Sequence, residues 1–280
     1  MAEAALRRPL PEETETLARF CAEAFSISPG YFLRRWLGDP SPDSFGVVLE
    51  LDREVLGYLH VFDRLLEAGD GALRCAGIGN VAVSGRHRGR GHARRLLDGA
   101  LTECRDVGYD VSVLYTHLPD VYRPHGFELI PVREVLLPGG DGAGWVETAE
   151  GEDRRLYEQE YGGRPWTVRR DTSYWDARSG WLEAEGWRLL GHQEESGYCW
   201  VRPDAAGGRV DEAVGACAAR VLRGGPGPGA WRCRVPLGAA AELPEAPPPA
   251  AVEMAARLRP DVRLDFFSLK GSVGWLTDGF

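Results

Sequence analysis

Residues 81–97 read VAVSGRHRGRGHARRLL, and this stretch decides the fold expected for the chain. Four arginines and three glycines fall between Gly85 and Arg94, directly after an apolar run and directly before a helical pattern. A helix that begins after glycines presents free backbone N–H groups, which bind phosphate oxygens, and nearby arginines add charge-assisted hydrogen bonds. The junction therefore predicts a phosphate-binding site rather than a solvated basic loop.

Three well-known kinds of nucleotide or nucleic-acid site do not fit this junction. The Walker pattern G-x-x-x-x-G-K-[ST] is absent because Arg90 stands at its second glycine, and G-x-G-x-x-G is absent because Arg94 stands at its last glycine. An RNA-binding segment rich in arginine and glycine would be repeated along the chain, which this one is not. The net charge of −9 also argues against a general nucleic-acid binder, because binding a polyanion requires a basic field.

The residues around the junction predict a mixed α/β unit. Residues 73–84 are small and apolar on both faces, as in a strand at the centre of a sheet. Residues 45–66 are typical of a hairpin around the turn Asp52–Arg53. After Gly91, apolar residues recur at the spacing of an amphipathic helix. The other elements expected in this half are helices near 17–24 and 29–38 and strands over 109–118 and 127–137.

The glycine-rich stretch LPGGDGAG, residues 137–144, is the best candidate for a domain boundary. We therefore expect two domains, over 1–140 and 141–280. The second half holds eight of the nine tryptophans, and no short tandem repeat is visible in it. Its expected elements are helices at about 171–185, 211–223 and 249–258 and strands over 230–237 and 262–269.

Composition and cysteine usage indicate a protein of the cytoplasm. No apolar run reaches the roughly 20 residues of a membrane span, and the N-terminal segment turns acidic where a signal peptide would be apolar. The six cysteines form no CxxC pair, so we expect buried, reduced thiols and no bound metal. We expect neither nucleic acid nor membrane among the partners, and a homo-oligomer is compatible with the sequence.

The stretch 81–97 resembles the acyl-coenzyme A loop of the GNAT N-acetyltransferase superfamily, whose pattern is [QR]-x-x-G-x-[GA] after a central strand. Two registers fit, beginning at Arg86 or at Arg88. In the family the first residue of the pattern stands five positions after the last apolar residue of the strand. Counting from Val83 selects Arg88. Gly85 stands where proline is commoner, a mild departure.

This resemblance implies how the cosubstrate acetyl-CoA would be held. Backbone N–H groups from Arg88 to Ala93 would bind the pyrophosphate, and the main chain at Val81 and Val83 would pair with the pantetheine arm. The residues implied to bind the cofactor are Val81, Ala82, Val83, Arg88, Gly89, Arg90, Gly91, His92, Ala93 and Arg94.

A second motif of the same family follows at residues 122–127. YRPHGF fits Y-x-x-x-G-[FY] with Tyr122, Gly126 and Phe127 in register, and its distance from the loop allows one helix and one strand. In such enzymes the tyrosine lies beside the thioester sulfur and protonates the departing thiolate. The resemblance covers residues 1 to about 136 and implies that Tyr122 is the general acid.

The second half resembles, more loosely, the second domain of tandem GNAT proteins such as the enhanced intracellular survival acetyltransferases. Residues 152–178 carry Y, RP, R and W in similar order, but the chain is too short for the third domain of that group. The second half also lacks a [QR]-x-x-G-x-[GA] loop between a strand and a helix. The expected fold class is α/β (α+β): a GNAT fold with a central mixed sheet flanked by helices, followed by a degenerate GNAT-like domain that binds no cofactor and forms a wall of the acceptor groove.

Together these inferences predict an N-acetyltransferase. The amine would attack the thioester of acetyl-CoA directly, without an acyl-enzyme, because Cys75 and Cys104 occupy apolar positions and do not resemble nucleophiles. The acceptor could be an aminoglycoside-like compound, a polyamine, an amino-acid derivative or a protein amine. The alternative is a non-catalytic protein that senses acyl-CoA or binds a metabolite.

The general base is the least defined part of the expected site. Many GNAT enzymes place a glutamate at the position of Gly77, but no Asp or Glu lies from Ala72 to Leu97. The side chains that could replace it are Glu50, Glu54, His60, Asp63 and His117. The enhanced intracellular survival group uses its C-terminal carboxylate, and this chain ends with the largely apolar GWLTDGF. The resulting hypothesis is that the carboxylate of Phe280 accepts the amine proton, and the alternative is a tail that only packs.

Overall fold

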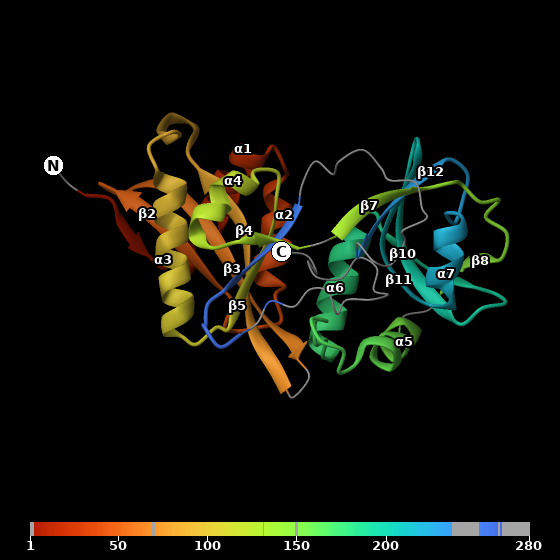
Figure 1. The fold of residues 1–280 in the computed structure, drawn as a ribbon. Coiled ribbons are helices and arrows are strands. Elements are labelled where there is room, and N and C mark those ends of the chain that lie inside the picture. The colour runs from red at the N-terminus through yellow and green to blue at the C-terminus, as the bar shows by residue number, and fades with distance from the viewer. Residues whose placement is uncertain are drawn as a thin grey trace.

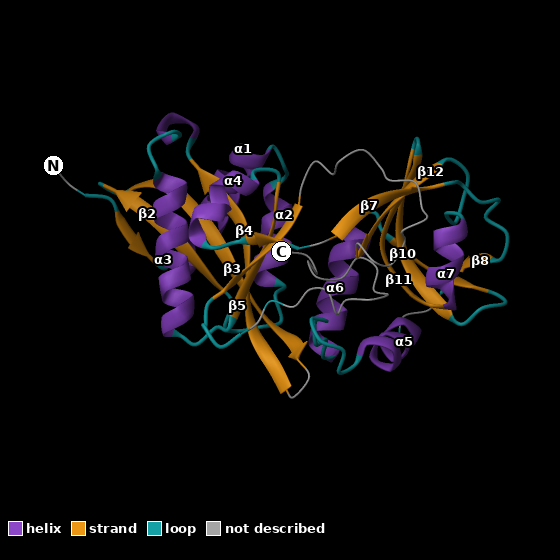
Figure 2. Ribbon diagram, in the orientation of Figure 1, coloured by secondary structure: helices purple, strands orange, loops and turns teal. Residues whose placement is uncertain are grey.

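Two mixed β-sheets, each flanked by helices, make up the fold (Figures 1 and 2). The computed structural model describes residues 3–68, 71–130, 132–148, 151–236, 252–262 and 264. The first sheet contains β1 (Ala5–Arg7), β2 (Phe45–Leu51), β3 (Glu54–Ala68), β4 (Gly71–Val83), β5 (Val111–Thr116), β6 (Glu128–Leu129) and β13 (Val252–Arg257). The second contains β7 (Val132–Leu137), β8 (Trp145–Glu147), β9 (Arg188–His192), β10 (Gly197–Asp204), β11 (Gly207–Gly215) and β12 (Ala230–Pro236). The helices are α1 (Thr14–Phe25), α2 (Pro29–Leu37), α3 (His92–Asp106), α4 (Pro119–Tyr122), α5 (Glu152–Tyr161), α6 (Thr172–Ala184) and α7 (Ala216–Arg223).

The first sheet has the order β1-β2-β3-β4-β5-β13-β6, so β4 lies at its centre as expected. β4 and β5 run parallel, and every other neighbouring pair in this sheet is antiparallel. β2 and β3 form the expected hairpin, in which Asp52 and Arg53 have φ of 49° and 68°. Two successive left-handed residues give a turn whose twist matches that of the flanking strands.

Helices cover both faces of the first sheet. Side chains alternate between the two faces along a strand, so neighbouring residues of β2 meet different helices. Val47 belongs to the apolar cluster that includes Leu96 of α3. Val48 belongs to the cluster that includes Leu17 of α1 and Phe32 of α2. The sheet therefore lies between α3 on one side and α1 with α2 on the other.

The second sheet repeats the connectivity of the first. β9, β10 and β11 are consecutive antiparallel strands, α7 follows, and β12 then pairs parallel with β11. In the first sheet β2, β3, β4, α3 and β5 have this same arrangement. However, β11 ends at Gly215 and α7 begins at Ala216, whereas residues 84–91 separate β4 from α3. The repeat confirms the expected second GNAT-like fold and shows that its strand passes into its helix without a loop.

The two sheets exchange one strand. β7 follows β6 in the chain but pairs with β12 in the second sheet. β13 follows β12 in the chain but pairs with β5 in the first sheet. Beside β5, β13 thus takes the place that β7 takes beside β12. β7 and β13 therefore do not follow the expected division of the chain at residue 140, because each pairs in the sheet formed mainly by the other half.

Three expectations about individual elements are wrong. Residues 127–137 do not form one strand but two, β6 and β7, which belong to different sheets. Pro131 stands between them in the sequence, and a proline cannot donate to a strand ladder. The expected helix over 211–223 begins only at Ala216, because β11 extends to Gly215. The expected helix over 249–258 is strand β13.

Burial explains why β13 is not a helix. Its sequence, VEMAAR, contains alanine, glutamate and methionine, which all favour helices when a segment is considered alone. In the structure it pairs with β5 on one side and β6 on the other, and Met254, Ala255 and Ala256 are at most 1% exposed. Pairing and burial on both faces outweigh a local preference that amounts to tenths of a kcal/mol per residue.

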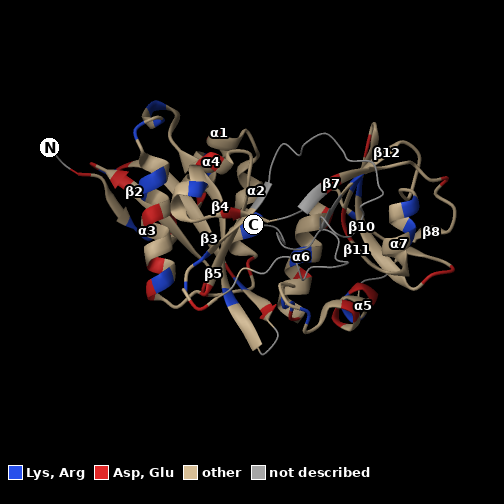
Figure 3. Ribbon diagram, viewed as in Figure 1, with Lys and Arg blue, Asp and Glu red and all other residues tan. Residues whose placement is uncertain are grey.

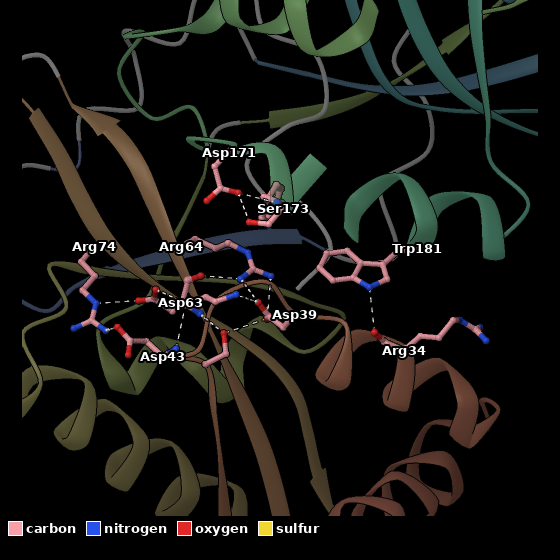
Figure 4. Close-up of polar contacts among 12 residues, drawn as sticks. Arg34, Asp39, Asp43, Asp63, Arg64, Arg74, Asp171, Ser173 and Trp181 are labelled. Atoms are coloured by element: carbon pink, nitrogen blue, oxygen red, sulfur yellow. Dashed lines mark hydrogen bonds and ion pairs between the residues drawn. The ribbon is translucent and has the colours of Figure 1, made fainter. Parts of the chain in front are cut away.

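The two halves of the chain also meet along the end of β3. Backbone groups of residues 65–67 pair with residues 166–169 through hydrogen bonds of 2.7 to 2.8 Å. Beside this contact, Arg64 donates to both carboxylate oxygens of Asp39 at 3.0 and 3.2 Å, and both side chains are buried (Figure 4). The Arg64 guanidinium also lies 4.9 Å from the centre of the Tyr174 ring. This interface is therefore built from backbone pairing and a buried, paired charge.

All six cysteines are buried and form no disulfide, as expected. Burial raises the pKa of the Cys104 thiol to about 12 and that of Cys21 to about 12, so both thiols are protonated at neutral pH. Burial also raises the pKa of Cys75. These thiols are therefore poor nucleophiles. No helix in the described part of the chain is long and apolar enough to cross a membrane.

We predict that Met254→Ala destabilises the protein although Met254 comes from the far end of the described chain. Met254 is fully buried beside β5, and truncation of a buried methionine costs about 2–5 kcal/mol. Urea unfolding followed by circular dichroism would measure the free energy of unfolding. Arg257→Ala, an exposed residue on the same strand, is the control and should change it by less than about 0.5 kcal/mol. Equal stabilities of the two variants would contradict the role of β13.

Candidate active site

The central strand β4 loses one of its two neighbours before it ends. Its pairing with β5 runs from Cys75 to Ile78, whereas its pairing with β3 continues to Val83. Within the described residues, no strand lies against the β5-facing edge of Val81–Val83. Such an edge offers backbone N–H and C=O groups to an extended ligand.

A β-bulge marks the point where β4 and β5 separate. Between the pairs Tyr58–Ala82 and His60–Gly79, one residue of β3 faces two residues of β4. Asn80 is one of these two and has a left-handed φ of 56°. A bulge bends its strand and increases the local twist. We therefore attribute the divergence of β4 from β5 to the extra residue at this point.

The arginine-rich loop connects this strand end to α3. A short 3-10 turn at Gly85–His87 precedes Gly89 and Gly91, whose φ values are 76° and 79°. These positive φ values favour glycine, and the space beside both residues is open. α3 begins at His92, and no side chain of the described residues caps its N-terminus. The N–H groups of its first turn are therefore available to an anion.

Positive charge gathers at this loop (Figure 3). Four of its side chains are exposed: Arg86, Arg88, Arg90 and Arg94. Among the residues that the structure describes, only Arg94 of these four has an ion pair, with Asp98 at 3.8 Å. Burial lowers the pKa of His92, and the charges of neighbouring residues, including Arg90 and Arg95, lower it further. The loop thus keeps a positive field in a chain whose net charge is −9.

Tyr122 lies at the end of α4 and is 9% exposed. It belongs to the apolar cluster between the sheet and α3, against which Val81 and Val83 also pack. Its ring meets Phe127 edge-on, with the ring centres 5.9 Å apart. Burial raises the pKa of its phenol, and a hydrogen bond with the Thr116 side chain opposes this to a smaller extent. The phenol is therefore protonated at neutral pH and able to donate.

The residues after Tyr122 explain the spacing of its motif. Gly126 ends the 3-10 turn Arg123–His125 with a φ of 86°, a conformation that favours glycine. His125 Nδ1 lies 2.8 Å from a carboxylate oxygen of Asp98 on α3. The tyrosine motif and the arginine-rich loop are thus both anchored to α3.

A cavity of about 260 Å³ opens on the face of the sheet that α1 and α2 cover. Its lining includes Trp36 of α2 together with Tyr58 and His60 of β3. The His60 imidazole stacks on the Trp36 indole, with centres 5.5 Å apart, and its Nδ1 lies 2.8 Å from the Tyr58 hydroxyl. Burial lowers the pKa of His60 to about 3, so this wall of the cavity is aromatic and uncharged.

The structure narrows the choice of general base. The three side-chain carboxylates considered are already paired with an arginine or a histidine: Glu50, Glu54 and Asp63. His60 is a poor proton acceptor because burial lowers its pKa to about 3. His117 lies edge-on to Tyr115, with ring centres 6.0 Å apart. Phe280 falls outside the residues that the structure describes, so the role of its carboxylate stays a prediction.

Two residues of this site were not singled out from the sequence, Asn80 and Trp36. Trp36 Nε1 donates to Asn80 Oδ1 at 2.9 Å. The sequence contains a signal for Asn80, because asparagine within an apolar strand is a candidate for a left-handed residue. It contains none for its partner, since 44 positions separate the two residues.

A comparison with family models gave a match over the first half of the chain. Residues 5–130 match the family model described as the acetyltransferase (GNAT) domain. The matched range contains the whole of β4, the arginine-rich loop, α3 and Tyr122. A comparison with curated proteins gave no significant match.

Solved structures share the fold over most of the chain. The GCN5-related N-acetyltransferase from Kribbella flavida has a TM-score of 0.68 and 19% identity, and the match covers 91% of this chain and 72% of that one. The GCN5-related N-acetyltransferase from Anabaena variabilis ATCC 29413 has a TM-score of 0.67 and 17% identity, and the match covers 92% of this chain and 73% of that one. Eis1 from Mycobacterium abscessus has a TM-score of 0.64 and 15% identity, and the match covers 91% of this chain and 74% of that one. At these identities the likeness concerns the fold, and the fold includes both sheets.

The family match contains both motifs that the structure anchors to α3, and the solved structures share the arrangement of two sheets. Residues 5–130 thus match the GNAT acetyltransferase domain, and the chain shares its two-sheet fold with these solved structures.

Proposed function

We propose that this protein transfers an acetyl group from acetyl-CoA directly to a primary amine. One observation carries the proposal. The unpaired edge of β4 leads, through a loop of exposed arginines, to the uncapped N-terminus of α3. An extended ligand that ends in phosphates fits the edge of β4 followed by the N-terminus of α3, because a strand edge binds an extended chain and a helix N-terminus binds an anion.

Acetyl-CoA would lie along this path. Its pantetheine arm pairs with the main chain of Val81 and Val83, on the edge that β5 leaves free. Its pyrophosphate accepts hydrogen bonds from the backbone N–H groups between Arg88 and Ala93, with Arg88, Arg90 and Arg94 supplying charge. The open space beside Gly89 and Gly91 lets phosphate oxygens approach the backbone closely.

The reaction we propose needs two proton transfers. The amine nitrogen attacks the thioester carbonyl carbon, a C–N bond forms, and collapse of the tetrahedral intermediate breaks the C–S bond. Tyr122 donates its phenolic proton to the departing thiolate, and its raised pKa keeps that proton in place before the reaction. The second proton, from the amine, goes to a base, for which we propose the α-carboxylate of Phe280.

The acceptor we propose is a small molecule with an apolar or aromatic part. The cavity of about 260 Å³ beside Trp36, Tyr58 and His60 has room for one ring system, and Trp36 links it to β4. Of the acceptor classes expected from the sequence, an amino-acid derivative fits this description better than an aminoglycoside-like compound, a polyamine or a protein amine. The residues that line the cavity all come from the first half of the chain. The second half reaches this region through α6, which contacts α2, and this contact is the support for a wall of the acceptor groove formed by the second half.

We predict that Arg88→Glu lowers the affinity for CoA by roughly 10- to 100-fold, because loss of a charge-assisted hydrogen bond is compounded by repulsion. Isothermal titration calorimetry with CoA measures this. Arg105→Glu makes the same charge change at the other end of α3, about 20 Å away, and should bind CoA as the native protein does. Equal affinities of the two variants would overturn the placement of the pyrophosphate.

We predict that Tyr122→Phe retains CoA affinity but lowers kcat by roughly 10²–10⁴-fold, the usual contribution of a general acid. Thiol release measured with a panel of amines provides kcat and KM separately. An unchanged kcat with a raised KM would reduce Tyr122 to a wall of the pocket. Tight CoA binding by the native protein without thiol release for any amine would favour the alternative of an acyl-CoA sensor.

We predict that one extra glycine after Phe280 lowers kcat, because it moves the terminal carboxylate by one residue. A variant with Phe280 retained and its carboxylate amidated tests the charge without a change in length. Melting temperatures establish that both variants fold. Full activity in both folded variants would exclude the carboxylate as the base.

A further inference from the structure

The bulge in β4 decides which groups of the strand face the cosubstrate. Ala76 and Ile78 point to the α3 side of the sheet. Regular alternation would continue this with residues 80 and 82, but Ala82 packs on the side of α1 and α2. Val81 and Val83 pack on the α3 side instead. The extra residue at the bulge has therefore shifted the alternation by one position, as a one-residue slip would.

A side chain from another element holds the bulge. Asn80 has the left-handed φ that the bulge requires, and Trp36 of α2 donates its indole N–H to Asn80 Oδ1 at 2.9 Å. The indole itself has little freedom, because its ring packs against three aromatic rings with centre distances of 5.0 to 5.6 Å. These rings are Phe32, Tyr58 and His60. The hydrogen-bond donor is thus presented to β4 from a rigid aromatic cluster.

The second half of the chain fixes the position of α2. The indole N–H of Trp181 on α6 donates to the carbonyl oxygen of Arg34 at 3.1 Å, in the last turn of α2 (Figure 4). Arg35 forms an ion pair of 2.6 Å with Glu185, and its guanidinium lies 5.0 Å from the centre of the Trp181 ring. Asp39, which follows α2, is held by the buried Arg64. α2 therefore cannot shift without breaking contacts to α6 and β3.

We propose that Trp36 is a positioning residue for the cosubstrate strand, and that α6 acts on that strand through it. Trp36 keeps Asn80 in its left-handed conformation, which keeps the main chain of Val81 and Val83 turned toward the pantetheine arm. Trp181 keeps Trp36 in place by holding the last turn of α2. This inference rests on the proposed binding of acetyl-CoA along β4, and it gives the second half of the chain, through α6, a role in that binding without any contact to the ligand.

Trp36→Phe tests the proposal, because it keeps an aromatic ring in the cluster and removes the N–H donor, together with one of the two fused rings. Isothermal titration calorimetry with CoA alone needs no acceptor, so effects on the neighbouring cavity do not enter. We expect the Kd for CoA to rise roughly three- to tenfold, the range for loss of one neutral hydrogen bond. Trp181→Phe should raise it in the same direction, although Trp181 belongs to the other half of the chain.

Two further variants separate positioning from general destabilisation. Asn80→Asp keeps the accepting oxygen and tolerates the left-handed conformation, so it should bind CoA more tightly than Asn80→Ala. Trp187→Phe makes the same substitution at a half-buried tryptophan of the second half, whose apolar cluster contains no residue of α2, and should leave the Kd unchanged. If Trp36→Phe does not fold, Asn80→Ala carries the test, because it leaves the aromatic cluster intact.

The outcomes distinguish this inference from the proposed function. If the native protein does not bind CoA, the proposed function fails. If the native protein binds CoA and Trp36→Phe or Asn80→Ala binds it equally well, the proposed function stands and the positioning role is overturned. If Trp36→Phe and Trp187→Phe raise the Kd equally, the effect is one of stability and the positioning role is also overturned.

Discussion

Neither sheet of this protein is completed by its own half of the chain, and the rest of the structure depends on that exchange of strands. β13 pairs with β5 over its full length, from Val111 to Thr116. β5 can therefore leave β4 after Leu114 without losing its place in a sheet. Without β13, the same divergence would leave β5 with unpaired backbone groups on both sides, and buried unpaired groups are costly. The gap between β4 and β5, which would receive the pantetheine arm, thus depends on β13, because β13 keeps β5 paired.

Arginine has two different uses in this chain. In the interior it is paired, as in Arg64 with Asp39 and in Arg170 with Glu212, whose side chains are fully buried. Removal of one partner from such a pair leaves a buried charge uncompensated. At the loop before α3 the arginines are exposed, and their positive charge faces solvent at a helix N-terminus. Arginine thus stabilises the fold where it is buried beside a carboxylate, and we propose that it binds an anion where it is exposed at this loop.

The site was predictable where its geometry is local. The glycines at 89 and 91 and the arginines around them lie within one loop, and their backbone conformations follow from residue type. The same holds for Gly126, whose left-handed turn explains the spacing from Tyr122. The tie between Trp36 and Asn80 was not predictable, because it depends on how α2 packs against the sheet. The choice among Glu50, Glu54 and Asp63 as a base likewise depended on partners that lie 11 to 43 positions away in the sequence.

The sequence by itself determined the elements whose pattern is complete within a few residues: the hairpin at Asp52–Arg53, the central strand, the loop and the amphipathic α3. Periodicity and turn chemistry are local properties, so they can be read along the chain. Only the tertiary structure decided that residues 252–257 are a strand and that β6 and β7 belong to different sheets. The physical reason is that strand pairing joins segments regardless of their separation, and burial in a sheet outweighs the small helical preference of a sequence such as VEMAAR.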